Sequence, residues 1–256
     1  MRHISVGTVV KEAADLWSQH LLALLPLGTF VYALGVAVFF GVTEGINRLP
    51  FLASRPGLAD DASVLEALTA AFTLLAGPAL GLMLGGAVIT FFWAACCRVA
   101  LEQAPVASAV KSMGKDVRIA VRFVFTAAVT LFLALIPVAL ATAIGGTAGR
   151  VVLLLGLISL VRAWPYWMVL VPLSQRDDGP FLRRFSQLVP REAKRSLWVL
   201  GGLLVLITVV VSVPAALAVT MNAPPLLVAC VLVPFHAALA PMQAFIQARA
   251  YAQLTS

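Results

Sequence analysis

Two basic side chains, Arg162 and His236, lie deep inside long apolar stretches of the sequence. A guanidinium keeps its charge at any physiological pH, and an imidazole can accept a proton near neutral pH. Inside a membrane segment such groups bind anions, relay protons or pair with acidic groups. We therefore look for chemistry at these two residues first.

Arg162 stands in the middle of the stretch ISLVRAWPYWMVL. On a helix, Ser159 and Tyr166 would share its face, and Pro165 would free a carbonyl one turn earlier. We predict that these carbonyls and hydroxyls satisfy Arg162 in a kinked helix. Two alternatives stay open. Arg162 could face a water-filled cavity and bind an anionic substrate or lipid headgroup, or it could meet an acidic group of another chain.

His236 lies between Pro234 and Pro241, and Gln243 follows seven residues later, close to the same helical face. A line of His and Gln side chains could conduct protons or contact a substrate. A histidine that is hydrogen-bonded to a neighbouring helix is the commoner arrangement. We therefore predict a structural role, with a polar cavity as the alternative.

The sequence carries no recognisable pattern of an enzyme active site. It has no carboxylate pair within an apolar stretch, no Ser/His/Asp set and no phosphate-binding glycine loop. The three cysteines do not have metal-ligand spacing. We expect a protein without catalytic residues, cofactor or metal.

The composition shows which elements must position these residues. Of 256 residues, 61% are hydrophobic and only 11% are charged, whereas about a quarter of a soluble domain is charged. Several apolar runs reach the roughly 20 residues that cross a bilayer. We predict an all-α polytopic protein with a single integral membrane domain over residues 1–256 and six transmembrane helices, at about 20–43, 67–97, 123–145, 151–173, 197–220 and 226–247.

The basic residues lie mostly on one side of these spans. Fourteen of the 18 Lys and Arg residues fall on the side of the termini and three on the other, while Arg162 lies within a span. This asymmetry places both termini in the cytoplasm. The net charge of +7 therefore indicates membrane orientation, and no nucleic-acid partner is expected. On the other side, GGTAG and MNAPP predict tight turns between antiparallel helices.

Three amphipathic stretches lie on the cytoplasmic side, at 4–20, 104–123 and 177–196. We expect interfacial helices there, with Trp17, Arg183 and Arg184 at the lipid headgroups. These stretches could bind anionic lipid or dock a partner protein. Pro190 should end the third stretch before the next span begins.

Gly77, Gly81 and Gly85 recur every four residues within the second predicted span. Such a face lets another helix approach closely. We predict packing against a span of the same chain, with a homodimer interface as the alternative.

The segment 160–206 resembles a bacterial family of six-span membrane proteins. That family includes stand-alone proteins and the membrane domain of some glycerophosphoryl diester phosphodiesterases. The resemblance implies the six-span fold, the bacterial inner membrane and a recurring structural role for Arg162. It implies no phosphodiesterase activity, because the catalytic barrel is absent. Phe185 departs from the family's usual serine. The matching residues are Arg162, Pro165, Asp177, Asp178, Gly179, Arg183, Arg184 and Trp198.

These observations predict a non-enzymatic accessory or scaffold subunit of a membrane assembly. The alternative is a transporter or channel for a small anionic or lipid-like solute, with Arg162 and His236 in a central cavity. The expected partners are the lipid bilayer, including anionic lipid, and other membrane subunits or a second copy of the chain.

Overall fold

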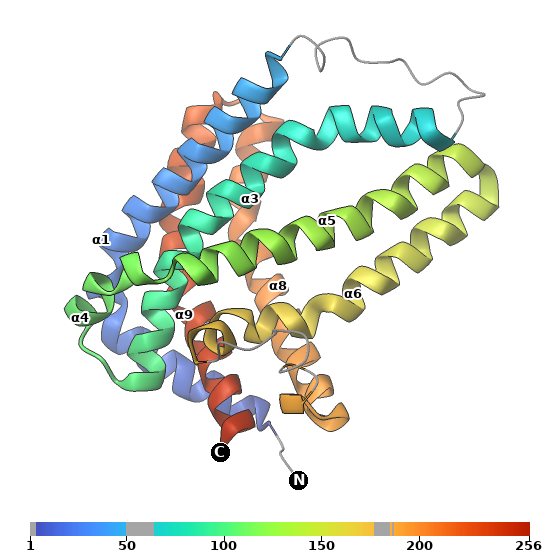
Figure 1. The fold of residues 1–256 in the computed structure, drawn as a ribbon. Helices are drawn as coiled ribbons and strands as arrows, with labels where there is room; N and C mark the ends of the chain where they lie inside the picture. The colour runs from blue at the N-terminus through green and yellow to red at the C-terminus, as the bar shows by residue number, and fades with distance from the viewer. Residues whose placement is uncertain (1–3, 50–63, 177–184, 186) are drawn as a thin grey trace. The chain divides into compact units, whose positions relative to one another are not determined.

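The structure, a computed structural model, describes residues 4–49, 64–176, 185 and 187–256. These residues form helices and no strands, so the all-α prediction is confirmed for them. Figure 1 shows the elements α1 (Val6–Asn47), α3 (Val64–Glu102), α4 (Val106–Lys111), the 3-10 helix η1 (Met113–Lys115), α5 (Val117–Ile144), α6 (Gly146–Arg176), α8 (Arg191–Thr220) and α9 (Pro225–Thr255).

The chain is a multi-pass membrane protein. Five helical stretches in its described part are long and apolar enough to cross a bilayer. The sixth predicted span, 151–173, falls in α6, where the apolar stretch Gly146–Gly156 is too short to cross by itself. The number six therefore stays a prediction. The five stretches are Val6–Asn47, Ala76–Glu102, Val117–Val138, Arg191–Pro214 and Leu227–Thr255.

The helices divide between two compact units, and α1, α3, α5 and α6 each contribute to both. The single domain predicted over residues 1–256 stays a prediction. Unit 1 consists of Met1–Leu34, Ala87–Arg122 and Pro165–Ser256, and unit 2 consists of Gly35–Gly86 and Phe123–Trp164.

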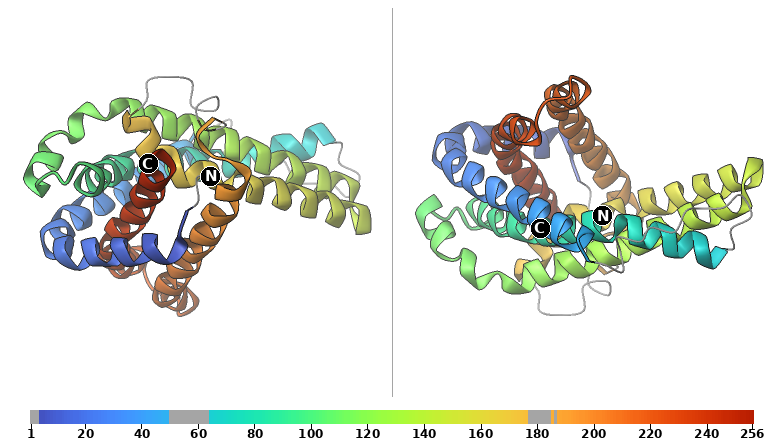
Figure 2. Two further views of the ribbon diagram at one scale, coloured as in Figure 1. Left: turned by 90° about the horizontal axis from the view of Figure 1, so that it is seen from below. Right: turned by 90° about the horizontal axis from the view of Figure 1, so that it is seen from above.

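The core of unit 1 is built around the second half of α9. Ala237, Ala240 and Ala244 are completely buried there, and their small side chains let neighbouring helices approach closely. Figure 2 shows α9 among α1, α3 and α8. The Cys97 thiol of α3 donates a hydrogen bond to the carbonyl of Ala244, at 3.6 Å. The helix continues beyond the predicted span to Thr255, and Ala248, Ala250 and Leu254 in this extension are buried.

Unit 2 contains two close helix pairs. Gly145 and Gly146 have φ angles of +66° and +54° and make the turn between α5 and α6. The turn is as tight as the sequence predicts, because glycine adopts these angles without steric cost. Gly149 and Gly156 of α6 then lie directly against Ala141 and Pro137 of α5.

The other pair in unit 2 brings α3 against α1. Gly77, Gly81 and Gly85 all face α1, and a Cβ on Gly85 would come within 2.5 Å of the Gly35 carbonyl oxygen. The predicted glycine face thus lies at a contact within the chain.

The first predicted amphipathic stretch forms the beginning of α1. Ile4, Val9 and Ala13 are buried on one side of it. In Figure 1 these first turns run at a steep angle to the rest of the helix within unit 1. The second stretch forms α4, η1 and the start of α5.

The third amphipathic stretch is described only in part, since 177–184 and 186 lie outside the described residues. Pro190 precedes the first residue of α8, Arg191, as predicted for a helix boundary.

Candidate functional site

The residues predicted around Arg162 are described only in part. The backbone of α6 is helical through Ser159 and Arg162, but both side chains lie outside the described residues, as do Arg183 and Arg184. Tyr166 is described, and its ring stacks on Phe185 with the centroids 4.0 Å apart. The role of Arg162 therefore stays a prediction.

His236 links α9 to α8. Its Nδ1 lies 3.0 Å from the carbonyl oxygen of Leu232, and its Nε2 lies 3.4 Å from the Ser212 hydroxyl. A carbonyl oxygen only accepts hydrogen bonds, so Nδ1 carries a proton. The Ser212 hydroxyl also lies 2.8 Å from the carbonyl of Thr208, to which it donates. The imidazole therefore donates within α9, and its Nε2 lies beside Ser212 of α8.

Gln243 makes the same link two turns further along α9. Its amide donates a 2.8 Å hydrogen bond to the Thr208 hydroxyl, which donates to the carbonyl of Leu204. Gln247, on the next turn of α9, is buried, and its Oε1 has no partner among the described residues. The structure thus brings both predicted polar residues of α9 against α8.

Aromatic residues connect the other helices of unit 1 to this site. The Trp93 indole N–H of α3 donates to the Tyr32 hydroxyl of α1 at 3.1 Å, and the Tyr32 ring centroid lies 6.4 Å from that of His236. We call Tyr32, Trp93, Thr208, Ser212, His236 and Gln243 the His236 cluster. Trp17, predicted at the headgroups, donates its indole N–H to the carbonyl of Ala238 at 2.7 Å.

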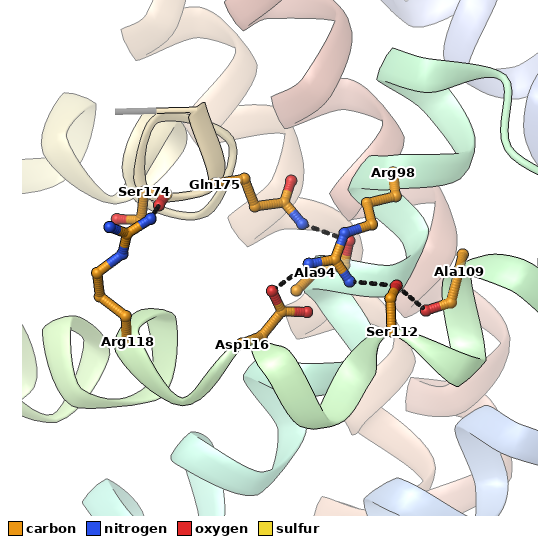
Figure 3. A network of polar contacts seen from close by, with 8 residues as sticks. All are labelled: Ala94, Arg98, Ala109, Ser112, Asp116, Arg118, Ser174 and Gln175. Carbon is orange, nitrogen blue, oxygen red and sulfur yellow. Dashed lines mark hydrogen bonds and ion pairs between the residues drawn. The ribbon is translucent and has the colours of Figure 1, made fainter. Parts of the chain in front are cut away.

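A second polar group, which we call the Arg98 network, consists of Arg98, Ser112 and Asp116 (Figure 3). Arg98 donates to the Ser112 hydroxyl at 2.6 Å and forms an ion pair with Asp116. The Arg98 and Asp116 side chains are only 16% and 5% exposed. The network joins the end of α3 to both ends of η1.

The end of α6 joins the same region. Gln175 donates to the carbonyl of Ala94 at 2.7 Å, and Arg118 lies 3.5 Å from the carbonyl of Ser174. Figure 3 shows these side chains converging from α3, α5 and α6. The end of α6 is therefore fastened to the same part of α3 that carries Arg98.

Burial raises the pKa of the Asp116 carboxyl above its ordinary value of 3.8, and the hydrogen bond from Arg98 opposes that shift. The charge of Glu102 raises the pKa further. One carboxylate oxygen of Asp116 is buried and has no partner among the described residues. The ion pair thus compensates the loss of hydration only in part.

The His236 cluster contains a hydroxyl and an imidazole, the pair of groups that nucleophilic catalysis uses. The Ser212 hydroxyl donates to Thr208, however, and both residues lie inside helices whose backbone N–H groups are already used. The backbone of these helices therefore supplies no oxyanion donor beside Ser212. Among the described residues, no group of three His, Cys, Asp or Glu side chains is arranged to hold a metal ion.

Sequence reasoning missed several of these residues. In the sequence, Arg98 is one of the 14 basic residues on the side of the termini, and no pattern pairs it with Asp116. Tyr32 and Trp93 carried a usable signal, because each places a polar group in an apolar span and must find a partner. The identity of that partner depends on which helices are neighbours.

Comparisons of the chain with protein-family models, curated proteins and solved structures found no match.

Proposed function

We propose that this chain is a non-enzymatic accessory or scaffold subunit of a membrane assembly. The observation that supports this role best is the use of polar side chains within the membrane helices. Trp93 of α3 donates to Tyr32 of α1, and Gln243 of α9 donates to Thr208 of α8. Such hydrogen bonds hold helices together, whereas a transport path presents polar groups to a solute.

We further propose six spans in a bacterial cytoplasmic membrane, with α6 as the sixth and both termini in the cytoplasm. The distribution of basic residues supports this orientation. The backbone N–H of Ser5 donates to Gln253 Oε1 at 2.9 Å, so both ends of the described chain lie together. An even number of membrane crossings likewise places the two ends of a chain on the same side of the membrane. The order of residues in segment 160–206 supports membership in the bacterial family of six-span membrane proteins that this segment resembles.

The outer surface offers packing contacts for an assembly. Along α8, Leu206, Val209, Val210 and Val213 are exposed large apolar side chains. Lipid tails and apolar helices of another subunit both fit such a face, and association in lipid depends mainly on packing.

The first experiment is purification of the tagged protein from its native membrane in a mild detergent, followed by native mass spectrometry. The subunit role predicts a second protein at fixed stoichiometry. The same sample is then reconstituted in liposomes and tested for flux of small anions, with protein-free liposomes as the blank.

A protein that purifies alone and increases anion flux would replace the subunit proposal with the transporter alternative. Gln243→Leu is the matched variant for that case. It removes the hydrogen bond to Thr208 and places an apolar side chain in the His236 cluster. Flux through this cluster should then fall, while flux from leaky liposomes should not change.

A further inference from the structure

Among the described residues, the region around α4 has more basic than acidic side chains. Asp116 pairs with Arg98, and Glu102 is exposed at the end of α3. Lys111 and Lys115 are exposed, and their side chains have no ion pair or hydrogen bond in the described part of the chain. In the described part of the chain, their positive charges are therefore not neutralised and are open to an anionic ligand.

These two lysines are carried by a well-anchored scaffold. Arg98 contacts Ser112 and Asp116, the two residues that flank η1, and the Ser112 hydroxyl donates to the carbonyl of Ala109 at 2.8 Å. Ala109 is buried. The backbone that presents Lys111 and Lys115 is therefore ordered before a ligand binds, which lowers the entropic cost of binding.

An apolar stripe begins next to the lysines. Val117 and Val121 open the membrane helix α5 and are 58% and 60% exposed. They are four residues apart and therefore share a helix face. Lys115 precedes this stripe by two residues. A phospholipid has the matching arrangement, with a charged phosphate at one end of its apolar chains.

We propose that Lys111 and Lys115 bind the phosphate of an anionic phospholipid whose acyl chains lie along Val117 and Val121. The apolar stripe selects a lipid over free phosphate. The excess of positive charge selects an anionic over a zwitterionic headgroup. This deepens the proposed function by naming a lipid partner, and it requires only that the chain is inserted in a membrane.

The test uses the purified full-length chain in detergent with equal amounts of phosphatidylglycerol and phosphatidylcholine, with bound lipid counted by native mass spectrometry. The Lys111→Gln/Lys115→Gln variant should bind phosphatidylglycerol about 25-fold more weakly, since each lysine near an anionic surface contributes about a factor of five. Phosphatidylcholine binding should not change. The control is Arg48→Gln/Arg150→Gln, which removes the same charge outside the three amphipathic stretches.

Equal losses in both double variants would overturn the proposal, because they would reflect overall charge. Unchanged binding in the Lys111/Lys115 variant would also overturn it. A second variant, Val117→Ser/Val121→Ser, should weaken binding of long-chain more than short-chain phosphatidylglycerol. Displacement of the lipid by millimolar inorganic phosphate would show a free phosphate site instead. Since no other protein is present, failure here leaves the subunit proposal untouched.

Discussion

Trp93 and Tyr32 show how a polar group of a single residue finds a hydrogen-bond partner in an apolar environment. An indole N–H that loses its acceptor inside a bilayer has no water to replace it. The Tyr32 hydroxyl on α1 meets this demand at 3.1 Å. Gln243 finds its acceptor on α8 in the same way, whereas the Nδ1–H of His236 finds the carbonyl of Leu232 on its own helix.

Tyr32→Phe should therefore destabilise the folded protein by about 1–2 kcal/mol, because it removes the acceptor of the Trp93 indole. The measurement is reversible unfolding by SDS in mixed micelles. Trp93→Phe provides the control in a double-mutant cycle. If Tyr32→Phe lowers the free energy of unfolding by the same amount in the Trp93→Phe background, the loss of the Trp93–Tyr32 hydrogen bond does not explain the destabilisation.

Asp116 should make stability depend on pH. Because burial raises its pKa in the folded state above 3.8, the folded protein keeps this proton at pH values where the unfolded chain releases it. The contribution of Asp116 is thus largest below the unfolded pKa and is lost as pH rises through the folded pKa. Asp116→Asn removes this contribution.

We expect the thermal midpoint of the wild type, minus that of Asp116→Asn, to fall as pH increases from about 4. Thermal unfolding in detergent at a series of pH values measures it. A difference that grows with pH would mean that the attraction of Arg98 exceeds the effect of burial.

At the scale of the helices, glycine faces decide how closely two elements pack. Gly81 of α3 lies so near α1 that an added Cβ would be 2.7 Å from the Phe39 carbonyl oxygen. Gly202 of α8 has nothing within 4 Å of the same position. Gly81 therefore permits a close contact between two helices, whereas Gly202 makes no such contact.

Gly81→Ala should destabilise the protein by about 1–3 kcal/mol, because the backbone of α1 must move to accommodate the methyl group. Gly202→Ala should be neutral or stabilising by up to about 1 kcal/mol, because alanine is the better helix former. Reversible unfolding by SDS measures the free energy of unfolding of both variants. Equal effects would place α1 and α3 farther apart than they are in this structure.

At the scale of the whole molecule, the chain ends lie at one side of unit 1. Ser5 contacts Gln253, the Ser196 hydroxyl donates to the carbonyl of Ile4 at 3.0 Å, and Arg249 lies 3.5 Å from Glu12. These contacts join the N-terminal end of the described chain to α8 and α9. They also agree with the placement of the basic residues on the side of the termini.

Cysteine labelling tests the orientation. In a Cys230→Ser background, Asn222→Cys should react with a membrane-impermeant maleimide in intact cells, because residue 222 lies in the exposed turn between α8 and α9. Ser256→Cys should react only after the membrane is permeabilised. Cys96 and Cys97 are buried and should remain silent in both cases. Labelling of both engineered cysteines in intact cells would contradict the proposed topology.

The sequence by itself determined the class of the protein and the position of most helices. Apolar runs must leave water, and Gly145, Pro190 and Pro225 mark where helices end or begin, because these effects are local. The glycine face of α3 was visible for the same reason. The contacts of Arg98 with Asp116, of Trp93 with Tyr32 and of His236 with Ser212 needed the tertiary structure. Each joins residues from different elements, and a polar group shows only that it needs a partner until the fold decides which side chain lies within hydrogen-bond distance.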